Sequence, residues 1–205
     1  MVTTRAGCRG AAPRLGCLVM RSVDDEVGEA ADRVVTLVGA VPAQSGVCTV
    51  IGIDGPSGSG KSTLAAAVAE RLNCPIVHMD DLFPGWDGLA AATRLVHDQV
   101  LVPLVQGRAG GYRRWDWHAS RWAETVPVPW VPVLVVEGCA STVRPAGDLV
   151  AVPVWVEADA AVRMTRGIER DGETFRPHWE RWAAQERDLF DRDGTRGRAD
   201  LIVQT

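Results

Sequence analysis

The sequence has almost no lysine. Of its 22 basic residues, all but Lys61 are arginine. Arginine carries a broad planar guanidinium, whereas lysine carries a compact ammonium that acts as a point charge, so the two are not interchangeable where a ligand demands one of them. The single lysine therefore marks a position at which arginine would not serve.

The sequence also lacks an excess of basic charge and a long apolar run. It has 22 basic residues against 26 acidic ones and a net charge of -4, which leaves no broad basic surface for a nucleic acid. No uninterrupted apolar stretch approaches the roughly 20 residues that a membrane helix requires. We therefore expect neither nucleic acid nor a membrane as a partner, and an anionic ligand would need a local binding site.

The cysteines do not form a recognisable framework. There are five of them, an odd number, and no two form a CxxC pair. This pattern argues against both a set of disulfides and a zinc site. It is typical of proteins of the reducing cytoplasm, where we expect this protein to act.

Length and composition predict one globular domain over residues 22–205. A chain of 205 residues with 46% hydrophobic side chains can bury a sizeable core. Residues 1–21 hold four arginines and no acid, and their apolar run is shorter than that of a signal peptide. We expect a disordered N-terminal tail there, and a start of translation at Met20 instead of Met1 is left open.

Five short apolar runs alternate with helical patterns along the chain. The runs cover residues 47–53, 76–79, 131–136, 150–156 and 201–203, and the helical patterns cover residues 22–39, 62–72, 89–102, 159–170 and 177–190. Short continuous apolar strands between helices are typical of a mainly parallel sheet with helices on both faces. The sequence therefore predicts an α/β fold with a five-stranded sheet, and it predicts a loop at residues 110–130.

Acidic residues follow three of the predicted strands. Asp54 ends the first, Asp80 and Asp81 follow the second, and Glu137 ends the third. In parallel α/β sheets, ligands bind outside the carboxyl ends of the strands. We expect these acids to meet at one edge of the sheet.

A glycine-rich loop follows the first predicted strand and matches the pattern GxxxxGK[ST] at every fixed position. Its backbone N–H groups and the start of the next helix can surround a phosphate, and the ammonium of Lys61 can reach the outer phosphates. The hydroxyl of Ser62 would bind Mg²⁺, and Thr63 would support the helix start or the base-side phosphate. The residues predicted to bind the nucleotide are Gly55, Ser57, Gly58, Ser59, Gly60, Lys61, Ser62 and Thr63.

Missing motifs exclude two other classes of nucleotide-binding protein. GTPases of the Ras type recognise guanine with NKxD, but this chain has one asparagine, Asn73, and no second lysine. The LSGGQ motif of transporter ATPases is absent as well. A small-molecule kinase is the leading class, and a regulatory nucleotide-binding module without an acceptor is the alternative.

Six segments, taken in order, resemble the uridine kinase branch of the P-loop kinases, which also includes relatives of phosphoribulokinase and pantothenate kinase. They are IGIDGPSGSGKST at 51–63, HMDDLF at 78–83, an aromatic-Asp-aromatic segment at 112–117, VVEG at 135–138, DAAVRMTRGIERD at 159–171, and the closing segment at 199–203. The resemblance implies a P-loop NTPase fold with a small arginine-bearing lid. It also implies that the protein binds ATP and Mg²⁺.

The resemblance implies roles for residues beyond the loop. Asp80 resembles the general base that accepts the proton of the substrate hydroxyl, and Asp81 is the alternative for this role. Glu137 resembles the acid that holds Mg²⁺ through water. Arg166 and Arg170 resemble lid residues that neutralise the transferring phosphoryl group.

The acceptor side is expected to include an aromatic segment. Asp116 resembles the acid that contacts the sugar hydroxyls of the acceptor, and the side chains around it would suit a planar ring, although core packing explains them equally well. The expected acceptor is a nucleoside of the uridine or cytidine type, with pantothenate, gluconate or a nucleoside monophosphate as alternatives. The sequence leaves the oligomeric state open, a homo-oligomer included. The candidate acceptor contacts are Asp80, Tyr112, Asp116, Trp117 and His118.

Overall fold

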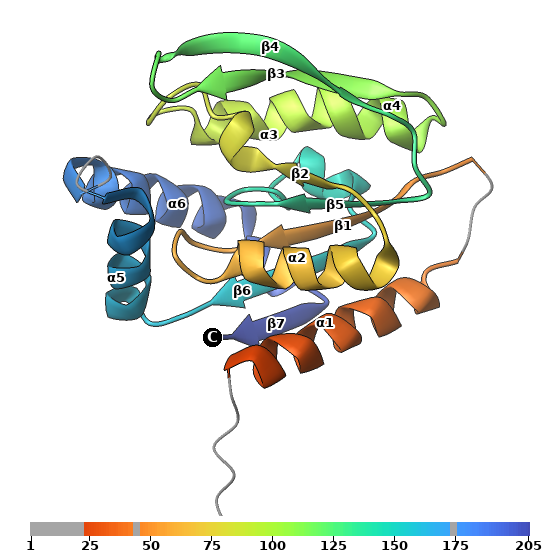
Figure 1. The fold of residues 1–205 in the computed structure, drawn as a ribbon, viewed down its shortest axis with the longest axis horizontal. Helices are drawn as coiled ribbons and strands as arrows, with labels where there is room; N and C mark the ends of the chain where they lie inside the picture. Colours follow the sequence, from red (N-terminus) through yellow and green to blue (C-terminus); the bar gives the residue numbers. More distant parts are fainter. Residues whose placement is uncertain (1–22, 43–45, 173–175) are drawn as a thin grey trace, which may run out of the picture.

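The fold is built around one parallel sheet. The structure, a computed structural model, describes residues 23–42, 46–172 and 176–205, so the tail expected at residues 1–21 lies outside the described residues. Five strands pair in the order β2, β5, β1, β6, β7, all parallel (Figure 1). The predicted five-stranded α/β fold is thus confirmed. The strands are β1 (Thr49–Asp54), β2 (Ile76–His78), β5 (Val133–Glu137), β6 (Val152–Glu157) and β7 (Leu201–Gln204).

The central strand β1 is buried on both faces. Ile51 and Ile53 belong to the core on one side of the sheet, and Val50 belongs to the core on the other side. Gly52, between Ile51 and Ile53 in the chain, allows Thr142 to approach the strand closely. A Cβ at this position would lie 2.4 Å from the methyl group of Thr142. The segment that follows β5 therefore packs directly on the carboxyl half of β1.

Two amphipathic helices cover one face of the sheet. They are α1 (Val23–Ala40) and α2 (Lys61–Leu72), which pack against each other and against the strands (Figure 1). Val34 and Val68 are fully buried against the sheet in the same core. Burial of these apolar stripes is what fixes α2, and hence its first turn at Lys61, on the sheet.

The opposite face is covered by a longer helical segment than the sequence predicts. It consists of α3 (Leu89–Val96), a π-helical turn (His97–Leu101) and α4 (Val102–Val105). The helix predicted at residues 89–102 continues past Pro103 and ends at Val105, shortly before Gly107. Proline lacks an N–H group and crowds the preceding turn, and the wider π-helical turn just before it relieves both problems.

The prediction of a loop at residues 110–130 is also wrong. The strands β3 (Gly110–Asp116) and β4 (Arg121–Val128) form an antiparallel hairpin above the α3 and α4 segment (Figure 1). Trp115 and Trp122 pack edge to face across the two strands, with their rings 5.2 Å apart. Such cross-strand aromatic pairs stabilise a hairpin, and they outweigh the glycine and proline residues that make the segment look irregular.

Two helices lie beyond the carboxyl ends of the parallel strands (Figure 1). They are α5 (Ala160–Asp171), which is the predicted arginine-bearing helix, and α6 (Trp179–Asp193). Phe190 of α6 packs edge to face on Trp155 of β6, at 4.8 Å between ring centres. Within the described residues, none of the helices has the length and apolar character needed to cross a membrane.

Asp54 ties the end of β1 to the segment after β5. Its carboxylate is fully buried and accepts four hydrogen bonds. One oxygen accepts the N–H groups of Gly55 (2.7 Å) and Ala140 (2.8 Å), and the other accepts the N–H (2.8 Å) and hydroxyl (2.9 Å) of Thr142. Burial raises the pKa of Asp54 to about 6, and the hydrogen bonds from Thr142 and Gly55 oppose that rise.

We expect Asp54→Asn to destabilise the protein by about 2–4 kcal/mol, because buried donors would lose their acceptor. Both carboxylate oxygens accept from donors, so the amide NH₂ of asparagine would face donors in either orientation. Urea unfolding, monitored by far-ultraviolet circular dichroism, measures the loss. Asp200→Asn, an exposed exchange of the same type, is the control, and equal stability of the two variants would contradict the role given to Asp54.

Candidate functional site

The phosphate loop, residues 55–62, connects β1 to α2 and depends on its glycines. Gly55, Gly58 and Gly60 have φ angles of 139°, 77° and 89°, a region that strains residues with side chains. A Cβ on Gly58 would also lie 2.2 Å from the backbone oxygen of Arg163 in α5. The glycines therefore serve both the turns of the loop and the close approach of the arginine-bearing helix.

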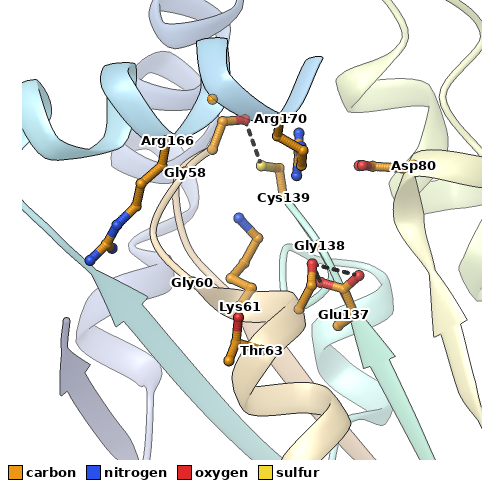
Figure 2. A pocket seen from close by; sticks show the side chains of 13 residues that line it. Gly58, Gly60, Lys61, Thr63, Asp80, Glu137, Gly138, Cys139, Arg166 and Arg170 are labelled. Atoms are coloured by element: carbon orange, nitrogen blue, oxygen red, sulfur yellow. Dashed lines mark hydrogen bonds between the residues drawn. The ribbon is translucent and has the colours of Figure 1, made fainter. Parts of the chain in front are cut away.

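The phosphate loop borders a cavity of about 200 Å³. In Figure 2 the ammonium of Lys61 points into it from below, the carboxylate of Asp80 points into it from the other side, and Arg170 reaches toward it from α5. The structure thus brings together residues from distant parts of the sequence. The predicted site residues that line the cavity are Ser57, Gly58, Gly60, Lys61, Ser62, Thr63, Asp80, Glu137, Arg166 and Arg170.

Lys61 is nearly buried, with 7% of its surface exposed, and its ammonium donates a hydrogen bond to the carbonyl oxygen of Pro56 at 2.9 Å. Burial alone would lower the pKa of Lys61. The acidic groups around it, Glu186, Glu137 and Asp54 among them, outweigh burial and raise the pKa above the ordinary lysine value. Lys61 is therefore a fixed positive charge at the floor of the cavity.

Two of the phosphate-loop residues predicted to bind the nucleotide do not line the cavity. The N–H of Gly55 is directed to Asp54, so this glycine shapes the loop and does not line the cavity. Ser59 is fully buried, and its hydroxyl has no hydrogen-bond partner among the described residues. Ser59 does not line the cavity, so this hydroxyl is not directed at the space where a phosphate would bind.

Oxygen ligands for a divalent cation lie beside the loop. The hydroxyl of Ser62 lies 3.2 Å from both carboxylate oxygens of Glu137. His78 shares a hydrogen bond of 2.6 Å with the same carboxylate, which raises the pKa of the imidazole above its ordinary value. The described residues contain no group of three or more His, Cys, Asp and Glu side chains that could hold a metal by themselves. The set fits Mg²⁺, which binds through one or two protein oxygens together with phosphates and water.

The two neighbouring aspartates have different surroundings. Asp80 lines the cavity, whereas Asp81 accepts a hydrogen bond from the hydroxyl of Tyr112 at 3.0 Å. That interaction and burial raise the pKa of Tyr112 above its ordinary value. Asp80 is held through its backbone, because the indole N–H of Trp117 donates to its carbonyl oxygen at 2.9 Å. Asp80 therefore lines the cavity, whereas the carboxylate of Asp81 is engaged by the hydroxyl of Tyr112.

The three arginines of α5 point in different directions. Arg163 donates to the carbonyl oxygen of Ser57 at 3.2 Å, so it braces the loop. Arg166 donates to the hydroxyl of Thr205 at 2.8 Å, and its guanidinium lies away from Asp80 (Figure 2). Arg170 reaches toward the space between Lys61 and Asp80 (Figure 2).

The aromatic segment lies behind the cavity wall. Of the predicted acceptor contacts, Tyr112, Asp116, Trp117 and His118 do not line the cavity. Asp116 accepts the N–H groups of His118 and Ala119 at 3.0 and 2.9 Å, so it closes the turn of its own hairpin. These hydrogen bonds lower the pKa of Asp116 below its ordinary value.

Sequence reasoning missed Glu186 and Cys139. Glu186 of α6 is 2% exposed and contacts both the phosphate loop and Cys139. Cys139 lines the cavity, and burial raises its thiol pKa well above the ordinary value, so the thiol stays protonated. The signal for Cys139 was its place directly after VVEG, but Glu186 sits in a charged helix that offers no such signal.

The comparisons with known proteins concern the fold. No family model matches this sequence, and no curated protein matches it. Solved structures do match. A "Possible Uridine Kinase from Bacillus stearothermophilus" has a TM-score of 0.59 and 19% identity, and the match covers 85% of this chain and 98% of that one. A "putative fructose transport system kinase from Silicibacter sp. TM1040" has a TM-score of 0.51 and 19% identity, with 86% and 98% covered.

These matches extend over almost the whole length of both solved structures. At 19% identity they concern the architecture and leave the chemistry to the residues. The chain therefore has the predicted P-loop NTPase fold, which is also the fold of these two solved structures.

Proposed function

We propose that this protein is an ATP-dependent kinase that transfers the γ-phosphoryl group to a hydroxyl of a small molecule. The observation that carries the proposal is the placement of Lys61 and Asp80 on opposite sides of one cavity, with Arg170 above them (Figure 2). Phosphoryl transfer needs positive charge around the transferring group and one carboxylate at the attacking hydroxyl. This cavity offers both.

The residues of the cavity divide the work of the reaction. The backbone N–H groups of the phosphate loop and the ammonium of Lys61 would hold the β and γ phosphates. Bound Mg²⁺, held by Ser62 and by Glu137 through water, would supply further positive charge at the phosphates. Asp80 would accept the proton of the acceptor hydroxyl, and Arg170 would neutralise charge on the transferring oxygens.

Arg166 has a different place in this proposal from the one that the resemblance implies. Its hydrogen bond to Thr205 holds it on the side of the phosphate loop away from Asp80. We therefore propose that Arg166 contacts the nucleotide nearer its base, and that Arg170 is the lid arginine at the reacting phosphoryl group. A rotation of α5 on closure would be needed for Arg166 to join it.

For the acceptor we propose first a nucleoside of the uridine or cytidine type. Tyr112 donates a hydrogen bond to Asp81 and Trp117 donates one to the backbone of Asp80, so aromatic side chains adjoin the segment that carries the proposed base without lining the cavity. Pantothenate, gluconate and nucleoside monophosphates belong in the same screen, because the cavity wall itself contains no aromatic side chain. Acceptor-stimulated release of ADP identifies the substrate in each case.

The first test concerns Lys61. We expect Lys61→Ala to lower turnover by several orders of magnitude and Lys61→Arg to be severely impaired, because a planar guanidinium replaces a compact ammonium. Steady-state turnover with saturating acceptor measures the effect, and circular dichroism checks the fold. Arg108→Lys, an exposed exchange between the same two residue types, is the control. Near-normal turnover of Lys61→Arg would refute the phosphate-site assignment.

The second test concerns Asp80. Asp80→Asn keeps the shape but cannot take the proton, so we expect acceptor-dependent turnover to fall by roughly 10²–10⁴-fold. ATP affinity, measured by calorimetric titration, should change much less, because the phosphate loop is untouched. Asp81→Asn is the matched variant, and it should affect turnover less than Asp80→Asn.

Three outcomes of this test would change the assignment. Loss of ATP binding in Asp80→Asn, as large as the loss of turnover, would make Asp80 a ligand of Mg²⁺. An inactive Asp81→Asn with an active Asp80→Asn would move the base by one position. If no acceptor stimulates ADP release in the unmodified protein, the kinase proposal fails and a regulatory nucleotide-binding module takes its place.

A further inference from the structure

A buried carboxylate of α6 forms hydrogen bonds with the phosphate loop. Glu186 of α6 is 2% exposed, and charged side chains are almost never buried to this extent without partners. Its Oε1 atom accepts hydrogen bonds from the N–H (2.8 Å) and hydroxyl (2.7 Å) of Ser57. The same atom accepts from the indole N–H of Trp182 at 2.8 Å and from the thiol of Cys139 at 3.1 Å.

Ser57 is held from two sides by these contacts. Its N–H is directed to Glu186, and its carbonyl oxygen accepts a hydrogen bond from Arg163 of α5 at 3.2 Å. The N–H and the carbonyl oxygen of Ser57 belong to the two peptide groups on either side of its Cα, so each of these groups is held by a hydrogen bond. Glu186 and Arg163 together therefore determine which N–H groups of the loop remain for a phosphate.

The contacts of Glu186 continue to the proposed base through three tryptophans. Trp182 packs edge to face on Trp86, with ring centres 6.0 Å apart, and Trp86 packs on Trp117 at 4.8 Å. The indole N–H of Trp117 then donates to the carbonyl oxygen of Asp80 at 2.9 Å. We call Trp182, Trp86 and Trp117 the tryptophan chain, and it joins α6 to the hairpin and to the segment after β2.

We propose that Glu186 is a positioning residue, which sets the phosphate loop through Ser57 and, through the tryptophan chain, holds the loop at a fixed distance from Asp80. Rigid packed side chains transmit displacement because cores are not continuously deformable. Binding at the phosphate loop is thereby linked to the position of the base. The role in turnover rests on the proposed function, whereas the role in shaping the loop does not.

The first experiment measures binding of ATP with Mg²⁺ by calorimetric titration to the full chain. We expect Glu186→Ala to raise the Kd of ATP by at least about tenfold, because the buried donors of Ser57 and Trp182 lose their acceptor. Glu186→Gln keeps an oxygen at the position that accepts all four bonds, so its Kd should stay within about threefold of the unmodified protein. Glu180→Ala and Glu180→Gln, exposed on the same helix, are the controls.

Two results would overturn the role in shaping the loop. One is a folded Glu186→Ala with an unchanged Kd, and the other is a Glu186→Gln as impaired as Glu186→Ala while both keep their melting temperature. If Glu186→Ala does not fold, Trp182→Phe takes its place, because it keeps an aromatic side chain and removes one donor to Glu186. All these measurements need ATP binding alone, so they stand even if no acceptor is ever phosphorylated.

The second experiment tests the link to the hairpin by amide hydrogen exchange. Residues 113–118 do not line the cavity, so a change in their exchange when ATP binds must be transmitted through the protein. We expect slower exchange there on ATP binding in the unmodified protein, and a loss of that effect in Trp182→Phe. Two results would overturn the tryptophan chain as the link. One is that ATP binding does not change amide exchange in residues 113–118. The other is that ATP slows this exchange in Trp182→Phe as much as it does in the unmodified protein.

Discussion

The site depends on the buried carboxylate of Asp54. Its two oxygens accept hydrogen bonds from the first N–H of the phosphate loop and from two residues of the segment that follows Glu137. One side chain therefore holds both loops against the central strand, and the sheet supplies a rigid base for them. Buried carboxylates are tolerated only when their oxygens are hydrogen-bonded as completely as these. Asp54, at the end of a strand, is therefore a buried structural residue that connects two loops of the fold.

The positive charge of Lys61 already has negatively charged neighbours before any nucleotide binds. Lys61 lies among carboxylates from three elements, and these raise its pKa. An arriving phosphate would meet a lysine that already has neighbours of opposite charge, which limits how tightly phosphate alone could bind. Additional positive charge from Mg²⁺ and from α5 would then be needed for tight binding, and this makes affinity depend on the cation and on the position of the helix.

Much of the fold could be predicted from the sequence, because the patterns that indicate it lie within short contiguous segments. The phosphate loop has a fixed spacing, and the five strands are continuous apolar runs, so Lys61, Ser62, Asp80 and Glu137 could be placed at one edge of the sheet from the sequence. The hairpin and the full length of the α3 and α4 segment could not be predicted from the sequence. Both depend on contacts within the folded protein, namely cross-strand pairing and a π-helical turn, which no periodic pattern of residues announces. Glu186 could not be found either, since its burial results from how α6 packs.

The single lysine has a practical consequence for chemistry at the site. Reagents that acylate amines have only Lys61 and the α-amino group to react with in this chain. Because Lys61 is 7% exposed and borders the cavity, a bound nucleotide would shield it, while an acyl phosphate carried by a nucleotide would be delivered to it. The modified peptide that contains Lys61 would then report occupancy of the phosphate loop, because the other reactive amine, the α-amino group, lies on a separate peptide.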